Sequence, residues 1–333
     1  MPSATLDAVI PETCLSAATA APSIHNTQPW SFRLDPGDGA IQVYAVPRRG
    51  LRHTDPTGRA LHLSVGACLF NLRVAIAHAG WSPVRRLLPC PQDPGLLATV
   101  RPAGAATRRT AGDRPDLYEA IRRRHSSRVP FSGRPLSPRL RSELAEAARA
   151  EGARLWFPDA AATTRLLRLT AEAEHRNRAD ADRAAESNRW VHRDPLSALD
   201  VGLPRAVLGP QDAHELLPMR DFTAQRHTER LPARPFETGP HLAVLLTEHD
   251  RRADWLRAGQ ALQHTWLLAT ASGLRASLLH QALEWPDLRA SLSPAPGRTG
   301  HAQVIVRLGY GPDGTASPRR APGRIVAEVP ASG

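Results

Sequence analysis

The pattern of apolar and polar positions along the chain predicts a mixture of helices and short strands. Two long stretches repeat apolar residues at helical spacing and predict helices over 59–79 and 252–272, closed by Gly80 and Gly273. Further helices are predicted over 11–20, 115–124, 138–150 and 161–190. Alternating or continuous apolar runs predict strands over 31–34, 41–46, 97–101, 153–157, 241–246 and 303–308. This mixture indicates an α+β fold.

The two long helices also match each other in the placement of their glycines. Gly66 lies 193 residues before Gly259, and Gly80 lies 193 residues before Gly273. Amphipathic helices that end in glycine are common, so coincidence would explain this match if it stood alone. The flanks match as well, since a stretch with proline and then a strand follows each helix. The pattern therefore predicts an internal duplication with halves over 1–112 and 113–333 and a linker over 103–114.

Residues 194–238 fit the pattern of neither half. This stretch is irregular, rich in proline, arginine and histidine, and longer than an ordinary connection between elements. Long loops often cover binding sites, so 194–238 is a candidate lid, with Trp190 and Phe222 as candidate apolar plugs. The alternative is a surface excursion that packs beside the seam between the halves.

The charge of the chain invites a nucleic-acid hypothesis, but its distribution argues against one. The 333 residues carry a net charge of +11 at pH 7. All 43 basic residues are arginine, and they are scattered along the chain without a basic tail. Arginine is abundant together with alanine, proline and glycine, which is typical of a GC-rich coding bias. We therefore expect no nucleic-acid partner.

Other features favour a cytoplasmic protein. The sequence contains no run of eighteen apolar residues, and its N-terminus lacks a basic stretch followed by an apolar one. Neither a membrane span nor a secretory signal is therefore expected. Cys14, Cys68 and Cys90 form no disulfide framework or metal-binding pattern, and free thiols in a reducing compartment are the expectation.

A dense polar turn lies where the first predicted helix ends and the first strand begins. Residues 21–30 read Ala-Pro-Ser-Ile-His-Asn-Thr-Gln-Pro-Trp. Two prolines, Pro22 first, fix the turn, so Ser23, Asn26 and Gln28 present their side chains in a set geometry. Such a turn can offer hydrogen bonds to a flat heteroaromatic ring. The alternative is that these side chains satisfy only their own backbone.

Two basic segments in the second half are candidates for holding a phosphate. Residues 122–128 read Arg-Arg-Arg-His-Ser-Ser-Arg, and arginine forks with a hydroxyl donor suit phosphate oxygens. Residues 317–322 add Arg319 and Arg320. The alternatives are a solvated basic helix end for the first segment and a solvated tail for the second.

Together these motifs resemble those of the nitroreductase family. The turn at 21–30 is similar to the segment that holds the flavin ring in that family, and 55–75 further resembles its two-domain, Acg-like branch. The turn at 124–131 resembles the flavin-phosphate signature, with Pro130 as an extra residue before Phe131. The phosphate-binding residues that this match implies are Arg124, His125, Ser126 and Arg128, with Arg320 as the first choice and Arg319 as the second from the C-terminal segment.

The resemblance implies a nitroreductase-like fold, an FMN cofactor and a small electrophilic substrate, with NAD(P)H or another donor as reductant. It implies that the first half supplies the ring turn (Pro22, Ser23, Asn26 and Gln28) and the second half the phosphate clamp. It also places Leu279, His280 and Gln281 near the reactive edge of the flavin, as positions only. Residues 147–157, the counterpart of the ring turn, lack its proline, serine, asparagine and glutamine. One composite site per chain is therefore expected.

Three hypotheses about function are compatible with the sequence. The first is an FMN oxidoreductase, in which the flavin carries the hydride and no side-chain acid or base is required, so no catalytic residue is assigned. The second is a protein that sequesters FMN under a lid with little or no turnover. The third is a flavin-free basic binding module. An internal pseudo-dimer removes the need for a second chain, so a monomer is favoured and a homodimer stays possible.

Overall fold

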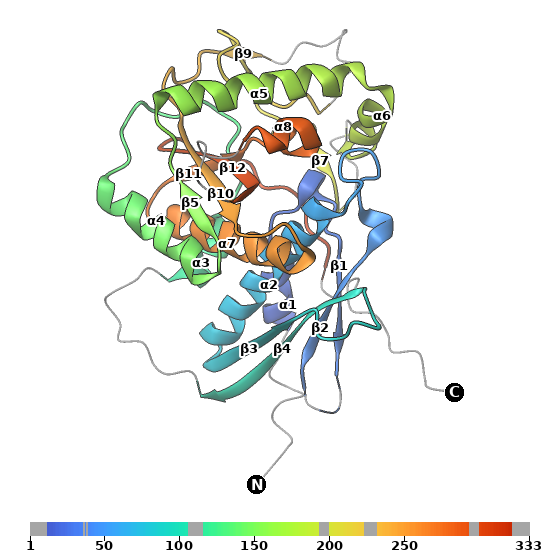
Figure 1. Ribbon diagram of the computed structural model, residues 1–333. Helices are drawn as coiled ribbons and strands as arrows, with labels where there is room; N and C mark the ends of the chain where they lie inside the picture. Colours follow the sequence, from blue (N-terminus) through green and yellow to red (C-terminus); the bar gives the residue numbers. More distant parts are fainter. Residues whose placement is uncertain are drawn as a thin grey trace.

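The computed structural model describes residues 12–35, 37, 39–105, 116–192, 200–222, 232–292 and 300–321. A pair of long helices runs through the centre of the molecule, and a four-stranded antiparallel sheet packs on each side of this pair (Figure 1). The α+β fold that the sequence predicts is confirmed.

The first half builds one sheet and its helices. Its elements are α1 (Glu12–Thr19), η2 (Ile24–Asn26), β1 (Trp30–Leu34), β2 (Ile41–Ala45), η3 (Pro47–Arg49), α2 (Arg59–His78), β3 (Trp81–Leu87) and β4 (Leu96–Ala105). The strand order in the sheet is β1-β2-β4-β3. Asp55 starts α2, because its carboxylate accepts the backbone N–H groups of Ala60 and Leu61 at 3.0 and 2.8 Å.

The second half builds the other sheet from an equivalent series of elements. They are α4 (Pro138–Ala150), β5 (Arg154–Trp156), β10 (His241–Thr247), α7 (Arg252–Ala271), β11 (Arg275–Leu278) and β12 (His301–Gly309), preceded by α3 (Leu117–Arg123). The strand order is β5-β10-β12-β11. This order corresponds strand by strand to that of the first sheet, with the long helix at the same place in both series.

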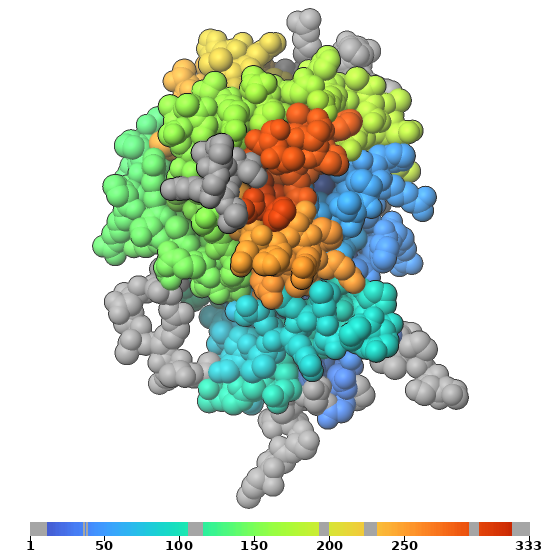
Figure 2. Space-filling model, viewed as in Figure 1, coloured from blue at the N-terminus to red at the C-terminus, as the bar shows by residue number. Residues whose placement is uncertain are grey.

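A long insertion between β5 and β10 distinguishes the second half. It contains α5 (Ala160–Ala179), α6 (Ala181–Arg189), β6 (Val191–His192), β7 (Leu203–Pro204), η4 (Arg205–Val207), β8 (Gln211–Asp212) and β9 (Ala233–Arg234). After β11 come η5 (Gln281–Glu284) and α8 (Pro286–Ala290). Helix α5 and the segment from η5 to α8 cover the outer face of the second sheet, and Figure 2 shows α5 and α6 in yellow-green above the orange and red residues of α7 to β12.

The two central helices cross at their matched glycines. A Cβ on Gly66 would lie 2.3 Å from the carbonyl oxygen of Leu256, and a Cβ on Gly259 would lie 2.1 Å from that of Leu63. Leu63 and Leu256 are themselves 193 residues apart. Each glycine of the pair therefore touches the equivalent residue of the opposite helix, which is the contact pattern of a two-fold interface.

Other contacts between α2 and α7 keep the same offset of 193 residues. His62 and Trp255 occupy equivalent positions and meet edge to face, with their ring centroids 5.4 Å apart. The hydrogen bond from Gln263 Nε2 to Asn71 Oδ1, 2.7 Å, has as its counterpart the stacked rings of Phe70 and His264. The contacts between α2 and α7 thus recur in pairs that are related by the same offset of 193 residues.

The structure corrects three details of the predicted elements. The helix expected over 161–190 is two helices, because the backbone of Asp180 is extended and its carboxylate caps α6 at the N–H of Arg183. Strands β3 and β11, which directly follow the glycine-terminated helices, were not predicted. The expected linker begins later, since β4 continues to Ala105; the boundary at 112/113 lies outside the described residues.

Helix α2 is long and apolar enough, by length and composition, to cross a membrane. Most of it is buried in the centre of the molecule, and buried core helices often share this length and composition. Among the described residues no other helix is as long and apolar.

The glycine crossing generates a prediction about stability. Gly66→Ala or Gly259→Ala should each lower the free energy of unfolding by about 2–3 kcal/mol, because the added methyl group overlaps a backbone carbonyl that cannot move without separating the helices. Urea unfolding of each variant measures the effect. Gly239→Ala is the matched control, since its Cβ would meet nothing within 4 Å. Equal stability of all three variants would contradict the close packing of α2 and α7.

Candidate active site

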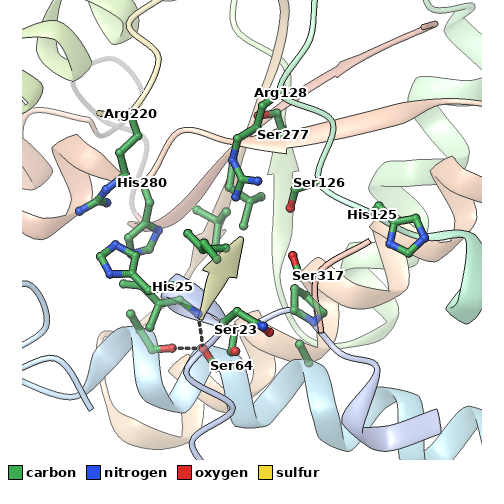
Figure 3. Close-up of a pocket in the computed structure, with 18 of the residues that line it drawn as sticks. Ser23, His25, Ser64, His125, Ser126, Arg128, Arg220, Ser277, His280 and Ser317 are labelled. Atoms are coloured by element: carbon green, nitrogen blue, oxygen red, sulfur yellow. Dashed lines mark hydrogen bonds between the residues drawn. The ribbon is translucent and has the colours of Figure 1, made fainter. Parts of the chain in front are cut away.

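One pocket lies between the two halves and brings together most of the residues singled out from sequence. Its walls come from the turn at 22–26, α2, the turn at 124–128, the end of β11, the segment 203–222 and the C-terminal segment 315–319 (Figure 3). The space between these walls, including the mouth, is about 1140 Å³. Ten of the predicted site residues line it: Pro22, Ser23, Asn26, Arg124, His125, Ser126, Arg128, Leu279, His280 and Arg319.

One end of the pocket is built from the two basic segments. His125, Ser126 and Ser317 lie together on this side in Figure 3. The backbone of Ser127 extends the second sheet, because its N–H donates to the carbonyl of Ala276 at 2.9 Å at the edge of β11. The C-terminal segment packs directly on this turn, since a Cβ on Gly314 would lie 2.6 Å from the oxygen of Ser126. Sheet and tail therefore hold the basic segments side by side.

Arg124 is a buried cation without a carboxylate partner among the described residues. Its residue is 3% exposed, its guanidinium lies 4.7 Å from the ring centre of Trp266, and its single hydrogen bond goes to the carbonyl of Ala20 at 3.3 Å. Its buried Nε has no partner in the described structure. Burial, and then the charge of Arg319, lower the pKa of Arg124 to about 9. This guanidinium is therefore placed to receive an anion.

Two further arginines, each half-buried, also lack a carboxylate partner among the described residues. Arg319 donates from Nη1 to Asn26 Oδ1 at 2.8 Å and to backbone carbonyls, and burial lowers its pKa to about 10. Arg128 donates to the carbonyl of Val207 at 2.8 Å, and burial, followed by the charge of Arg220, lowers its pKa to about 10. None of the described carboxylates forms an ion pair with Arg124, Arg128 or Arg319. Unpaired buried charge is costly, so these side chains favour a bound anion.

The turn at 22–28 is strained and tightly tied to the rest of the chain. His25, Asn26 and Gln28 have φ values of 47°, 54° and 50°. Residues other than glycine seldom adopt this left-handed backbone conformation. Ser23 Oγ accepts the N–H of Gln28 at 2.9 Å. Ser64 Oγ accepts the N–H of Ile24 at 3.2 Å, a bond that Figure 3 marks. Strain held by so many bonds is typical of functional turns.

The side chain of Asn26 joins three distant segments. Its Nδ2 donates to the carbonyls of Gly202 and Pro318 at 2.8 and 2.9 Å, and its Oδ1 accepts from Arg319. The amide that the sequence assigned to the ring thus has protein partners at both atoms, although Asn26 lines the pocket. The hydroxyl of Ser23 also has a protein partner, because it accepts the backbone N–H of Gln28 within the turn.

Three predicted site residues lie outside the pocket lining. Gln28 donates to the carbonyl of Asp200 at 2.7 Å and accepts from the N–H of Arg320 at 3.0 Å. Arg320 lies 3.5 Å from a carboxylate oxygen of Asp200, and Gln281 donates to the carbonyl of Pro218 at 3.1 Å. Arg319, the second choice from sequence, therefore faces the pocket, and Arg320, the first choice, does not.

The opposite end of the pocket combines His280, which the sequence resemblance assigned to the site, with His25 and Arg220, which it did not. His25, His280 and Arg220 lie together on this side in Figure 3. Phe222, a candidate plug, lines the pocket and meets His25 edge to face at 5.5 Å, whereas Trp190 is not in the lining. The sequence predicted the surrounding stretch as a candidate lid with Phe222 as a candidate plug, but nothing in its composition points to Arg220.

The described residues fit the FMN that the sequence resemblance implies. Buried arginines and the hydroxyls of Ser126 and Ser317 offer donors for a phosphate at one end. Apolar side chains from both halves, Ile24, Ala60, Leu63, Ala67, Leu262, Leu278, Leu279 and Val304, offer walls for a flat ring. No cluster of His, Cys, Asp or Glu suited to a metal ion occurs within the described ranges.

The place that corresponds to this pocket when the two halves are exchanged is filled by an ion network. Glu151, 4% exposed, pairs with Arg73 at 2.6 Å, with Arg85 at 3.5 Å and with His264 at 3.7 Å. Arg73 stands 193 residues before Trp266, the residue whose ring lies beneath Arg124. The short connection from α4 to β5 also leaves no room for a ring turn. Here the protein supplies its own anion.

Sequence similarity to known proteins shows the family of the chain. A Mycobacterium tuberculosis protein provisionally named an NAD(P)H nitroreductase is 32% identical over 92% of this chain and 86% of its own length. The chain belongs to the nitroreductase family. A second M. tuberculosis nitroreductase relative, with the provisional name acg, is 29% identical over 99% of this chain and 97% of its own length. The resemblance seen in the motifs is confirmed, although no family model matches the chain.

Solved nitroreductase structures resemble the chain only distantly. An FMN- and NADPH-dependent nitroreductase from Sphigopyxis sp. strain HMH is 14% identical with a TM-score of 0.40, over 64% of this chain and 99% of its own. A Desulfovibrio desulfuricans nitroreductase crystallised with FMN is 14% identical with a TM-score of 0.38, over 66% of this chain and all of its own. These likenesses are too distant to transfer residue positions.

The ion network predicts how stability depends on Glu151. Glu151→Gln should lower the free energy of unfolding by about 2 kcal/mol at pH 7, because it leaves Arg73 and Arg85 without their carboxylate; partial exposure of these arginines keeps the loss below that of a fully buried pair. Glu146→Gln, which breaks only a surface pair with Arg149, is the control and should change little.

The ion network also predicts how the stability difference between wild type and Glu151→Gln depends on pH. Burial alone would raise the pKa of Glu151, but His264, Arg73 and Arg85 outweigh it and lower the pKa below its usual 4.5. A lowered carboxyl pKa stabilises the fold above the unfolded pKa, and this contribution is lost as the pH falls through the folded pKa. The difference between wild type and Glu151→Gln should therefore shrink below about pH 4.5. A difference that grows in acid would contradict the network.

Proposed function

We propose that the protein is an FMN-dependent oxidoreductase that transfers reducing equivalents from NAD(P)H or another donor to a small electrophile. The observation that carries this proposal is a set of arginines, Arg124 buried and Arg128 and Arg319 half-buried, that face one pocket without a carboxylate partner among the described residues. Family membership supports the same function, since relatives carry the name NAD(P)H nitroreductase.

The residues of the chain take separate roles in this proposal. Arg124, Arg319, His125 and Ser126 hold the phosphate at one end of the pocket, and Arg128 adds positive charge along its wall. Leu278, Leu279 and the residues of α2 and α7 exclude water from the ring. Bound FMN supplies the hydride chemistry, so no side chain is assigned an acid or base role.

We further propose that the two halves, 1–112 and 113–333, imitate the two subunits of a nitroreductase homodimer within one chain. The matched strand orders and the two-fold contacts of α2 and α7 support this division. One composite site results, since Glu151 fills the equivalent place. A monomer in the cytoplasm then needs no second copy to complete its site.

Flavin sequestration is the second candidate, and the segment 200–222 favours it. This part of the expected lid is bonded to the site at three points: Gly202 to Asn26, Asp200 to Gln28 and Val207 to Arg128. Phe222 and Met219 enter the pocket lining from the same segment. Residues 223–231 of the expected lid lie outside the described residues. A segment tied in this way would restrict access to a bound flavin.

The phosphate clamp predicts a loss of affinity that depends on the phosphate itself. Arg124→Gln should weaken FMN binding by about 2–3 kcal/mol, because a buried phosphate loses a charged donor. It should leave riboflavin, which has no phosphate, almost unaffected. Fluorescence titration of the purified protein with each flavin measures both affinities.

A matched control is available on the same helix end. Arg123 is exposed, and Arg123→Gln should bind both flavins as the wild type does. If Arg124→Gln weakens FMN and riboflavin equally, the variant has disturbed the fold rather than the clamp. If it binds FMN as tightly as wild type, Arg124 is not a phosphate ligand.

Reduction by nicotinamide nucleotides distinguishes the two candidate functions. The FMN-loaded protein should lose its visible absorbance when NADPH or NADH is added without oxygen, since an oxidoreductase must admit its reductant. Stopped-flow absorbance measures the rate. A yellow protein that stays oxidised with both nucleotides but bleaches with dithionite would favour sequestration, and a protein that cannot be loaded with FMN would contradict both candidates.

A further inference from the structure

The end of the pocket opposite the phosphate clamp contains a buried histidine with no hydrogen-bond partner. His25 is 5% exposed, and neither of its ring nitrogens has a partner in the described structure. It lies in the pocket lining beside His280 and Arg220 (Figure 3). A buried polar group without a partner costs free energy, so its retention here points to a ligand that completes its bonding.

The protonation of both histidines follows from their surroundings. Burial, and then the charges of Arg220 and Arg128, hold the pKa of His25 well below 6.5. Burial and Arg59 act in the same direction on His280. Both rings are therefore neutral at pH 7, and a neutral imidazole keeps one N–H donor.

The tautomer of His280 is also fixed. Its Nε2 lies 3.1 Å from Nη2 of Arg59, and a guanidinium can only donate, so Nε2 accepts and the proton resides on Nδ1. Arg59 is held in turn by the carbonyls of Gln303 and Leu283 at 2.7 and 3.2 Å. His280 is thus a positioned N–H donor rather than a freely rotating side chain.

The charges around the two histidines are predominantly positive. Arg128, which has no carboxylate partner among the described residues, and Arg220 act on His25, whereas Arg59, Arg220 and Arg289 act on His280. Asp55, Asp250 and Glu284 offset part of the charge of Arg59. Arg220 is paired with Glu284, and Glu174 lies near this pair, so these charges largely cancel. Phe222 and Met219 supply apolar surface beside the imidazoles. An aromatic molecule with an electron-rich oxygen matches this combination of apolar wall, N–H donors and positive charge.

We propose that His25 and His280 form an oxygen-binding subsite that selects small anionic aromatic molecules over cationic ones. The inference rests on the proposed function, because Arg124, Arg319 and Ser126 at the other end of the pocket would hold the flavin phosphate. The imidazole N–H groups donate to the oxygen of the ligand, and the arginines stabilise its negative charge. No covalent step is assigned to either histidine, so both are specificity residues for the ligand.

The test uses FMN-loaded protein and two probes of equal shape, benzoate and benzamidine. Spectral titration of the bound flavin should show benzoate binding at least about tenfold more tightly than benzamidine. His25→Gly removes the imidazole at a position where φ of 47° suits glycine, so the turn keeps its conformation. This variant should lose about tenfold in benzoate affinity and regain most of it when free imidazole is added.

Two further variants separate the donor from general effects. His25→Asn retains an N–H donor and tolerates the left-handed backbone, so it should lose less benzoate affinity than His25→Gly. His175→Asn, on the exposed face of α5, is the control and should bind as wild type. A preserved flavin content in each variant shows that the clamp is intact.

Several outcomes would overturn the subsite. They are the absence of benzoate binding to the wild type, equal affinity for benzoate and benzamidine, or unchanged benzoate affinity in His25→Gly. A loss that free imidazole does not restore would indicate a structural role for His25. A protein that takes up no FMN would instead refute the proposed function, and the flavin absorbance distinguishes that case before any probe is added.

Discussion

The close crossing of α2 and α7 is the constraint on which the rest of the structure depends. Only glycine allows the backbones to meet at Gly66 and Gly259, and this contact brings the two sheets to opposite sides of one helix pair. The pocket lies where α2 of one half faces the basic turn of the other. A shift of one helix along the other would therefore separate Arg124 from the turn at 22–28 before it disturbed either sheet.

The halves share this crossing, but they differ in how buried positive charge is balanced. Glu151 of the second half balances Arg73 and Arg85 of the first half, and the protein itself closes that place. At the pocket Arg124, Arg128 and Arg319 have no described carboxylate, so the charge calls for a ligand from outside. A single carboxylate on a short connection thus separates a structural ion network from a binding site, although the surrounding folds correspond strand by strand.

Local patterns predicted the elements that depend on local forces. The two glycine-terminated helices, the helix over 138–150 and the central strands follow from periodicity and capping alone. The break at Asp180 was missed because an aspartate that caps a new helix has the same letter as one on a helix surface. At the site, the motifs predicted Arg124 and Arg319, whereas the place of Arg220 depends on a tertiary fold of the insertion that no periodicity encodes.

The amide of Asn26 shows that a sequence motif can locate a turn without revealing all the partners of its side chains. Sequence alone gives the hydrogen-bonding capacity of this residue, but the partners come from Gly202, Pro318 and Arg319, far along the chain. These bonds fasten the covering segment and the C-terminal segment to the strained turn. The Asn26 amide thus orients Arg319 and holds the segment 200–222 beside the pocket at the same time. A ligand held by Arg319 would therefore depend on the same bonds that fix this segment.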